Sequence, residues 1–380
     1  MKNMNIAKKI SIIIPVYGFG KYLKTLLSSI KKSRDQFDGE SEVIIVDGKP
    51  NKENEDIVQS FNYKYLKCSD DESINASRNM GIKSAQYPII LFVDSDCRLE
   101  ENLLNQHYLT YLNCKNPRIG AVLGLTLFEG KKKFGFKIMD QTPFTISFQF
   151  ANLMEKVPWG TCTNLSILKS TLDNIRNFSS DWPMKIGGED VDLGIKINLS
   201  GYEIITNKEA IVYHTSETWS SFKTNCKKVW TWGKSDFHLF AKYPHIQNPD
   251  IPSSISISFI LAFFILFFFL TNPHKYALLF FILILIFNYI LQILFQAFLK
   301  REENIKLLHL FFAEIIYSIF KLGFIYEGMK NLKIKPIYSM TSHSLNQVSY
   351  GWGNKVKKVW SQLYSLFISL FILFILIKVF

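Results

Sequence analysis

Residues 75–97 read NASRNMGIKSAQYPIILFVDSDC, and this stretch decides the fold. Its first half has the apolar spacing of a helix, and its second half is a continuous apolar run typical of a strand buried on both faces. The run ends in Asp94, Ser95 and Asp96. A helix that leads through a short loop into a buried strand predicts a parallel sheet covered by helices.

The residues before this stretch repeat the pattern. ISIIIPV (10–16) and SEVIIVDG (41–48) have the composition of buried strands, and each is followed by a helical pattern, at 22–33 and 56–62. Basic residues precede the first run, as in a signal peptide, but the run is short before Pro15 and no small-residue cleavage site follows. It predicts a first strand and not an export signal.

The residues after Asp96 are less regular. TLFEGKKKFGFK (126–137) predicts a hairpin or loop, and NLSILKSTLDNI (164–175) predicts a strand edge running into a helix. EDVDLGIKINLSG (189–201) predicts a helix that ends at its final glycine, and EIITNKEAIVYH (203–214) predicts a return strand. These elements complete an α/β domain.

Composition indicates a membrane partner. The chain has 380 residues and a net charge of +12, and its lysines crowd around C-terminal hydrophobic segments, at 300–306 and between 330 and 358. Anionic lipid headgroups attract such clusters by about 1 kcal/mol per residue. Charge therefore favours a membrane surface, and nucleic acid is not expected as a partner.

Cysteine usage is typical of a reducing compartment. The chain has five cysteines, an odd number, widely spaced and without a CxxC pair. We expect reduced, mostly structural thiols in a cytosolic domain, and no zinc site. The cysteines are Cys68, Cys97, Cys114, Cys162 and Cys226.

Long apolar runs follow the α/β region. Residues 254–270 and 276–299 are uncharged and long enough to cross a hydrocarbon layer of about 30 Å, and 362–379 predicts a third span. The composition therefore divides the chain into a first domain, 1–245, and a membrane domain, 246–380.

Two further segments are amphipathic. Residues 306–326 carry Glu314 and Lys321 on one helical face, which favours a helix lying in the membrane interface. If this helix crossed the membrane, the lysine-rich stretch 327–360 would lie outside, which the positive-inside rule disfavours. Residues 219–240 alternate aromatic and basic side chains. They predict an amphipathic helix, either packed on the first domain or lying at a membrane surface or acceptor site.

The first candidate site is the acidic pair at the end of the strand. Asp94 and Asp96 are two residues apart, so on a strand both carboxylates would point the same way. Hard oxygen ligands suit Mg²⁺ or Mn²⁺, which bridge to substrate phosphates. The alternative is a solvated turn.

Four other side chains have a functional and an ordinary interpretation. Glu189 and Asp190 follow two glycines, where a carboxylate either stabilises a helix N-terminus by about 0.3–1 kcal/mol or acts as a general base. His214 ends a strand, where it is an ordinary hydrogen-bonding residue or a metal ligand. Arg78 either neutralises a diphosphate or is a surface arginine.

Taken together, the motifs resemble family 2 of the glycosyltransferases, which have the GT-A fold. The resemblance covers about residues 9–240. It implies an α/β catalytic domain with a Rossmann-like nucleotide-binding sheet, followed in this chain by C-terminal transmembrane helices. The motifs, in the family's order, are SIIIPVYGFGKYL (11–23), EVIIVDG (42–48), ASRNMGIKSAQYPIILFVDSD (76–96), GGEDVDLGIKINLSGYEI (187–204) and AIVYH (210–214).

The resemblance assigns roles to the donor side of the site. It implies that Pro15, Tyr17 and Asp47 line the nucleoside pocket. It also implies that Asp94 holds the ribose side of the donor and that Asp96 holds the metal ion.

The resemblance assigns the remaining roles to the acceptor side. Asp190 would be the base of an inverting displacement, with Glu189 supporting it or the acceptor, and His214 would contact the metal or the diphosphate. Many relatives carry two adjacent acids after the second strand, whereas here Gly48 follows the acid. The nucleotide is therefore open, with a UDP-sugar favoured and a GDP-sugar possible.

The sequence departs from processive relatives in a second way. It has no QxxRW motif, and the nearest stretch is NCKKVWTWGK (225–234). We therefore expect a single addition of sugar. The expected acceptor is a lipid, such as a polyprenyl phosphate, or a glycan, and Trp159 and Asn164 are candidate acceptor contacts. The expected location is the cell membrane, with several spans and the catalytic domain in the cytoplasm.

Two other functions fit the same sequence less well. A catalytically idle GT-A domain that serves as a membrane scaffold in glycan assembly would be expected to have a damaged DxD or ED motif, and both are intact. A transporter would be expected to have an internal repeat or intramembrane acids. The expected spans contain no acidic residue, and the sequence has no internal repeat.

Overall fold

The computed structural model forms two compact units. The first unit holds most residues up to Ser220. The second unit begins at Ser221 and also includes the short segment 137–142. The predicted spans 254–270 and 362–379 lie outside the described residues, as does most of 276–299, and the domain boundary at 245 stays a prediction. The described residues are 6–18, 20–68, 73–244, 247–249, scattered positions between 283 and 294, 306–332 and 339–341.

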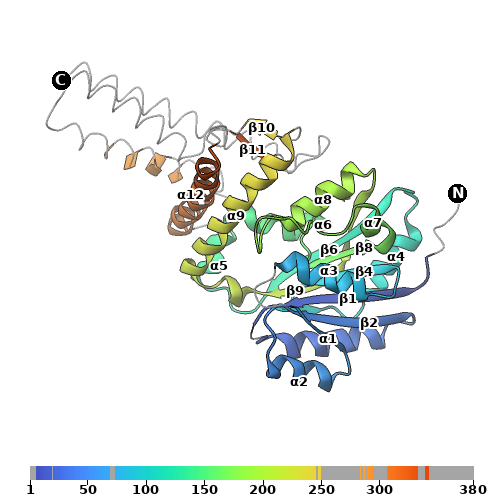
Figure 1. Cartoon of the computed structure of the whole chain (residues 1–380). Helices are drawn as coiled ribbons and strands as arrows, with labels where there is room; N and C mark the ends of the chain where they lie inside the picture. The colour runs from blue at the N-terminus through green and yellow to red at the C-terminus, as the bar shows by residue number, and fades with distance from the viewer. Residues whose placement is uncertain are drawn as a thin grey trace, which may run out of the picture. The chain divides into compact units, whose positions relative to one another are not determined.

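The first unit is built on a nine-stranded mixed sheet with the order β3-β2-β1-β4-β8-β6-β9-β5, and β7 lies beside β9 (Figure 1). Strands β1 to β4 are parallel where they pair, β8 is antiparallel to both of its neighbours, and β6 is parallel to β9. The strands are β1 (Lys9–Val16), β2 (Glu40–Asp47), β3 (Lys64–Lys67), β4 (Ile89–Val93), β5 (Cys97–Leu99), β6 (Ile119–Glu129), β7 (Lys156–Val157), β8 (Asn164–Leu168) and β9 (Glu203–Thr215).

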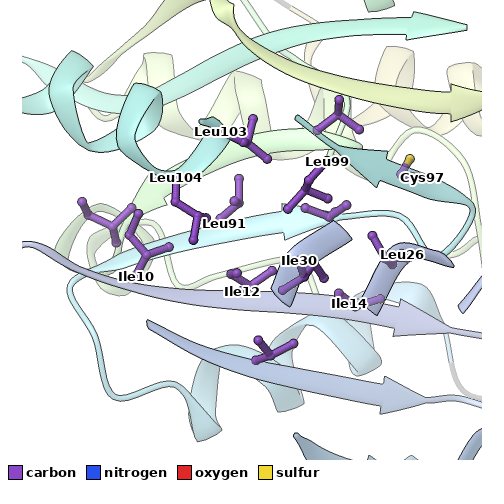
Figure 2. Close-up of a cluster of buried hydrophobic side chains, with 14 of the residues drawn as sticks. Ile10, Ile12, Ile14, Leu26, Ile30, Leu91, Cys97, Leu99, Leu103 and Leu104 are labelled. Carbon is purple, nitrogen blue, oxygen red and sulfur yellow. The ribbon is translucent and has the colours of Figure 1, made fainter. Parts of the chain in front are cut away.

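Helices cover both faces of this sheet because alternate side chains of each buried strand point to opposite faces. On one face the even-numbered isoleucines of β1 pack with α1 and α4, as Figure 2 shows for Ile10, Ile12 and Ile14. On the other face Ile13 packs toward α3, where a Cβ on Gly81 would lie 2.5 Å from its Cγ2 atom. The helices are α1 (Leu23–Asp35), α2 (Lys52–Ser60), α3 (Ile74–Ser84), α4 (Leu103–Asn113), α5 (Phe134–Met139), α6 (Phe150–Leu153), α7 (Lys169–Asn174) and α8 (Glu189–Leu199).

The structure confirms most predicted elements and corrects three. The strands expected at 10–16 and 41–48 are β1 and β2, and the return strand expected at 203–214 is β9. The sheet is not wholly parallel, and β8 is an interior strand and not an edge, because an apolar run specifies burial but not direction. The expected hairpin or loop at 126–137 is wrong in part, since β6 pairs with β9 as far as Glu129.

The described part of the second unit is dominated by α9 (Phe222–Lys242) and α12 (Leu307–Lys330), with the short strands β10 (Gln247–Pro249) and β11 (Ser339–Thr341). The helix expected at 219–240 is therefore confirmed as α9. Within the described residues, α12 alone is long and apolar enough to cross a membrane, and half of its most apolar window is buried. The expected interfacial placement of 306–326 stays a prediction.

Candidate active site

A buried arginine on α3 is shared by three carboxylates. Arg78 is 2% exposed, and its Nη1 atom lies 3.1 Å from Glu189 Oε1 and 3.2 Å from Asp190 Oδ1. Its Nη2 atom lies 3.8 Å from Asp94 Oδ1, and its guanidinium lies 5.2 Å from the ring centre of Phe178. Arg78 is therefore not a surface arginine. Its predicted contact with a diphosphate stays a prediction.

The loop before β8 donates hydrogen bonds to two of these three carboxylates. Thr163 Oγ1 donates a hydrogen bond to Asp94 Oδ2 at 2.6 Å, and the backbone N–H of Cys162 donates to Asp190 Oδ2 at 3.2 Å. Each carboxylate is thus oriented by the guanidinium and by a neutral donor. No motif of the sequence gives either loop residue a role in the site, and the one available signal is their place directly before the buried run of β8.

Two glycines position the acids at the start of α8. Gly187 and Gly188 have φ values of +100° and +78°, which L side chains rarely adopt, and α8 begins at the next residue. Burial raises the pKa of Glu189 to about 7, with repulsion from Asp190 adding to the shift and Arg78 opposing it. Burial also raises the pKa of Asp190, and Arg78 again opposes the shift.

The raised pKa of Glu189 predicts a pH-dependent stability. The folded state keeps this proton up to about pH 7, whereas the unfolded chain releases it near 4.5, so the folded state binds more protons between these values. The free energy of unfolding should therefore fall as pH rises through this window, by up to about 1.4 kcal/mol per pH unit. Thermal melts from pH 4.5 to 7.5 should show a flatter dependence for Glu189→Gln. The exposed Glu209→Gln should keep the wild-type slope, and equal slopes in all three proteins would contradict the assignment.

Asp96 lies beside His214, whereas Asp94 contacts Arg78 and Thr163. Strand β4 ends at Val93, and the chain then crosses to the far edge of the sheet, where Cys97 pairs with His214 in the β5–β9 ladder. The Asp96 Oδ1 atom lies 3.4 Å from His214 Nε2. The two carboxylates therefore do not lie on one strand as expected, because a turn follows β4, and their convergence on one site stays a prediction.

An aromatic cluster fixes the imidazole ring of His214. The rings of Phe128, Phe148 and Trp219 lie 5.3, 5.9 and 6.3 Å from it, centre to centre. Its Nδ1 atom lies 2.9 Å from the carbonyl oxygen of Thr215. A proton on Nδ1 donated to that carbonyl leaves the Nε2 lone pair facing Asp96, as in metal-binding histidines.

The donor atoms of this pair fit a divalent cation. The potential ligand atoms of Asp96, Cys97 and His214 lie within 4.8 Å of one another. Burial, followed by repulsion from Asp96 and Asp94, raises the pKa of the Cys97 thiol well above its usual value. Asp96 and His214 thus offer one carboxylate and one imidazole to a cation, and the Cys97 sulfur lies beside them.

The residues expected in the nucleoside pocket lie at the carboxyl ends of β1 and β2. Tyr17 is 64% exposed, Pro15 is half-buried, and a Cβ on Gly48 would lie 3.3 Å from Tyr17 Cδ2. Their contact with a nucleoside stays a prediction.

Asp47, the third of these residues, is fully buried and held by the protein itself. Its Oδ2 atom accepts hydrogen bonds from Asn54 Nδ2 at 2.7 Å and from the Tyr65 hydroxyl at 2.8 Å. Its Oδ1 atom accepts the backbone N–H of Lys49 at 2.9 Å. This carboxylate thus ties β2 to the loop and helix that follow it, and its role toward a nucleobase stays a prediction.

The two candidate acceptor contacts differ. Asn164 is fully buried, and its Nδ2 atom donates to the carbonyl oxygens of Leu125 and Ala210. It is a structural residue, so its proposed acceptor contact is wrong. Trp159 is half-buried with its ring 5.4 Å from that of Phe150, and its acceptor role stays a prediction.

Comparison with known proteins finds relatives that include two bacterial glycosyltransferases. The uncharacterized glycosyltransferase YfnE of Bacillus subtilis (strain 168) is 20% identical over 292 residues, which cover 64% of this chain and 72% of YfnE. The poly(ribitol-phosphate) β-N-acetylglucosaminyltransferase TarS of Staphylococcus aureus (strain Mu50 / ATCC 700699) is 35% identical over 101 residues, which cover 25% of this chain and 18% of TarS.

Among solved structures, the mannosyltransferase PcManGT of Pyrobaculum calidifontis, in complex with GDP-Man and Mn²⁺, is 16% identical, with a TM-score of 0.44. The match covers 61% of this chain and 64% of PcManGT. Residues 1–349 of TarS in complex with UDP are 18% identical, with a TM-score of 0.39, over 61% of this chain and 72% of that chain.

The family model described as "Glycosyl transferase family 2" matches residues 11–173. The matched segment includes most of β1, the acidic pair after β4 and the loop that holds Asp94 and Asp190. The chain therefore carries a glycosyl transferase family 2 domain and is a glycosyltransferase.

Proposed function

We propose that this protein transfers a sugar from a nucleotide-sugar to an acceptor in one inverting displacement, with Asp190 as the base. The observation that carries the proposal is the placement of Asp190. Its carboxylate is partly exposed, at 21%, while Arg78 and the Cys162 N–H orient it from the protein side. A carboxylate held in this way can face an acceptor hydroxyl and take its proton.

The reaction needs one step at the anomeric carbon. The acceptor oxygen forms the new bond as the bond to the nucleoside diphosphate breaks, and the acceptor proton passes to Asp190. No covalent intermediate forms, so the configuration inverts. Arg78 supports this step by orienting the base and partly balancing its charge, and Glu189 shares the same guanidinium nitrogen. Positioning of the two substrates supplies much of the remaining rate enhancement.

Asp96 and His214 are the residues that would hold a divalent cation, Mg²⁺ or Mn²⁺. When bound, such an ion offsets negative charge on the leaving nucleoside diphosphate. An imidazole beside the carboxylate favours a transition-metal ion, so we propose Mn²⁺ over Mg²⁺.

The donor and acceptor follow from the same proposal. A UDP-sugar is favoured and a GDP-sugar is possible. The acceptor is a cell-envelope glycan or a lipid-linked precursor, in keeping with the name of the relative TarS, a poly(ribitol-phosphate) β-N-acetylglucosaminyltransferase. The absence of QxxRW supports single addition. The C-terminal apolar runs and the apolar helix α12 support a membrane location with the catalytic domain in the cytoplasm.

A donor screen tests the proposal. Detergent-purified protein would be incubated with a panel of UDP- and GDP-sugars and Mn²⁺, and release of the nucleoside diphosphate would be followed. We expect wild type to release it from one donor. Release from none, together with no thermal stabilisation by any nucleotide, would argue for a catalytically idle domain.

Removing the carboxylate of Asp96 should abolish metal-dependent donor binding. In calorimetric titrations with the nucleotide, Mn²⁺ should tighten binding to wild type. For Asp96→Ala this gain should be lost, with at least about 100-fold weaker binding in the presence of the ion, since even outer-shell partners of metal sites contribute 10–100-fold. The exposed Asp35→Ala at the end of α1 should bind as wild type does. An unchanged Mn²⁺ effect in Asp96→Ala would contradict this metal assignment.

A further inference from the structure

Helices α9 and α12 pack against each other in parallel at backbone contact. A Cβ atom on Gly233 of α9 would overlap the carbonyl oxygen of Phe320, and one on Gly323 of α12 would overlap that of Trp230. The contact extends to both sides of this crossing. Phe222 stacks edge-on with Phe312 at 5.2 Å, Trp230 meets Tyr326 at 5.4 Å, and His238 Nε2 lies 3.3 Å from Glu327 Oε1.

One face of α12 is apolar and exposed. The side chains of this face are three, four or eleven residues apart, and each of these spacings returns to the same side of a helix. The buried positions of the opposite faces include the ionisable residues Glu314, Lys321 and Glu327. The exposed stripe consists of Leu308, Phe311, Leu322, Tyr326 and Met329, which are 37% to 59% exposed.

This stripe continues onto the uncharged run 276–299. The ring of Tyr289 meets that of Phe311 edge-on at 5.7 Å. Five other described side chains of the run are apolar and exposed, and they extend the apolar surface of the stripe. These side chains are Leu283, Ile286, Phe287, Ile290 and Leu294.

The depth of α12 in a membrane is limited by the lysines of α9. Gly233 meets the middle of α12, and Lys228 and Lys234 lie within two helical turns of that glycine. If α12 crossed the bilayer, these lysines would lie near its centre, where each costs about 2.5–3.5 kcal/mol. Lys223 and Lys227, on the exposed side of α9, would lie in one half of the hydrocarbon layer.

We propose that α12 lies along one leaflet of an anionic phospholipid bilayer, with its apolar stripe in the acyl boundary and the lysines of α9 at the headgroups. Positive side chains beside an apolar stripe match the two layers of such a surface, hydrocarbon and negatively charged headgroup. The glycine crossing makes α9 and α12 one rigid platform. This inference rests on the proposed membrane location and does not depend on which sugar is transferred.

Spin-label depth measurements on the full chain test the placement. The chain, with Cys114 and Cys226 replaced by serine, would be reconstituted into phosphatidylcholine vesicles containing phosphatidylglycerol. Single cysteines in place of Leu308, Leu322 and Met329 would be labelled, and their exposure to oxygen and to a water-soluble nickel complex compared. All three should lie at a similar depth, about 5–10 Å below the headgroups.

Two control labels and three alternative results separate this placement from a spanning helix, a dimer contact and a protein that does not bind membranes. Labels at Lys227 on α9 and at Lys83 on α3 should both be open to the nickel complex. A label at Leu322 near the bilayer centre, with those at Leu308 and Met329 near opposite surfaces, would show a spanning helix and overturn the proposal. Labels shielded from both reagents and coupled to each other would show a dimer contact, which also overturns it. Failure of the chain to sediment with membranes would instead refute the membrane location.

Discussion

Asp190→Asn should reduce turnover by about 10²–10⁴-fold, the usual contribution of a general base. The substitution keeps the size of the side chain and leaves an oxygen to accept the Cys162 N–H, but the amide cannot take a proton from the acceptor. Nucleotide affinity should stay within a few-fold, because the role proposed for Asp190 is on the acceptor side. Steady-state product formation and calorimetric nucleotide binding together would separate the two effects.

The exposed Asp173→Asn on α7 is the matched control, and it should retain wild-type turnover. Near-normal turnover in Asp190→Asn would remove Asp190 as the base and transfer attention to Glu189. A loss of nucleotide affinity as large as the loss of turnover would mean that the carboxylate acts in donor binding.

Arg78→Met should destabilise the protein by about 3–5 kcal/mol, the usual cost of removing one partner from a buried ion pair. Without the guanidinium, Asp94, Glu189 and Asp190 would face one another with no cation between them. The melting temperature of the detergent-solubilised protein should fall by roughly 10 °C, since 1 kcal/mol corresponds to about 2–4 °C in a domain of this size. Differential scanning fluorimetry would measure the shift.

A second substitution identifies the cause. If uncompensated charge is responsible, Glu189→Gln should add more stability to the Arg78→Met background than it adds to wild type. Arg118→Met is the matched control, because this exposed arginine pairs with Glu203 at the surface, where such pairs contribute about 0–1 kcal/mol. A melting temperature equal to that of wild type in Arg78→Met would show that the ion pairs do not stabilise the fold.

The α/β class, most element positions and the family could be predicted from local sequence patterns. Continuous β-branched runs specify buried strands, and helical spacing between them specifies covering helices, because burial and period are local properties. The motif order pointed to family 2, and the family model confirmed it over residues 11–173. The local pattern could not set the direction of β8, because an apolar run reads the same in both directions.

Which polar side chains contact each other became clear from the folded domain and not from the sequence. Arg78 and Glu189 are 111 residues apart, and no local pattern indicates that one buried guanidinium serves three carboxylates. Asp94 and Asp96 are neighbours in sequence, yet the turn after β4 sends one to Arg78 and Thr163 and the other to His214. Period and composition report how each segment is buried. The partners of a polar side chain depend on sheet order and on where strands end, and these are set by packing over the whole domain.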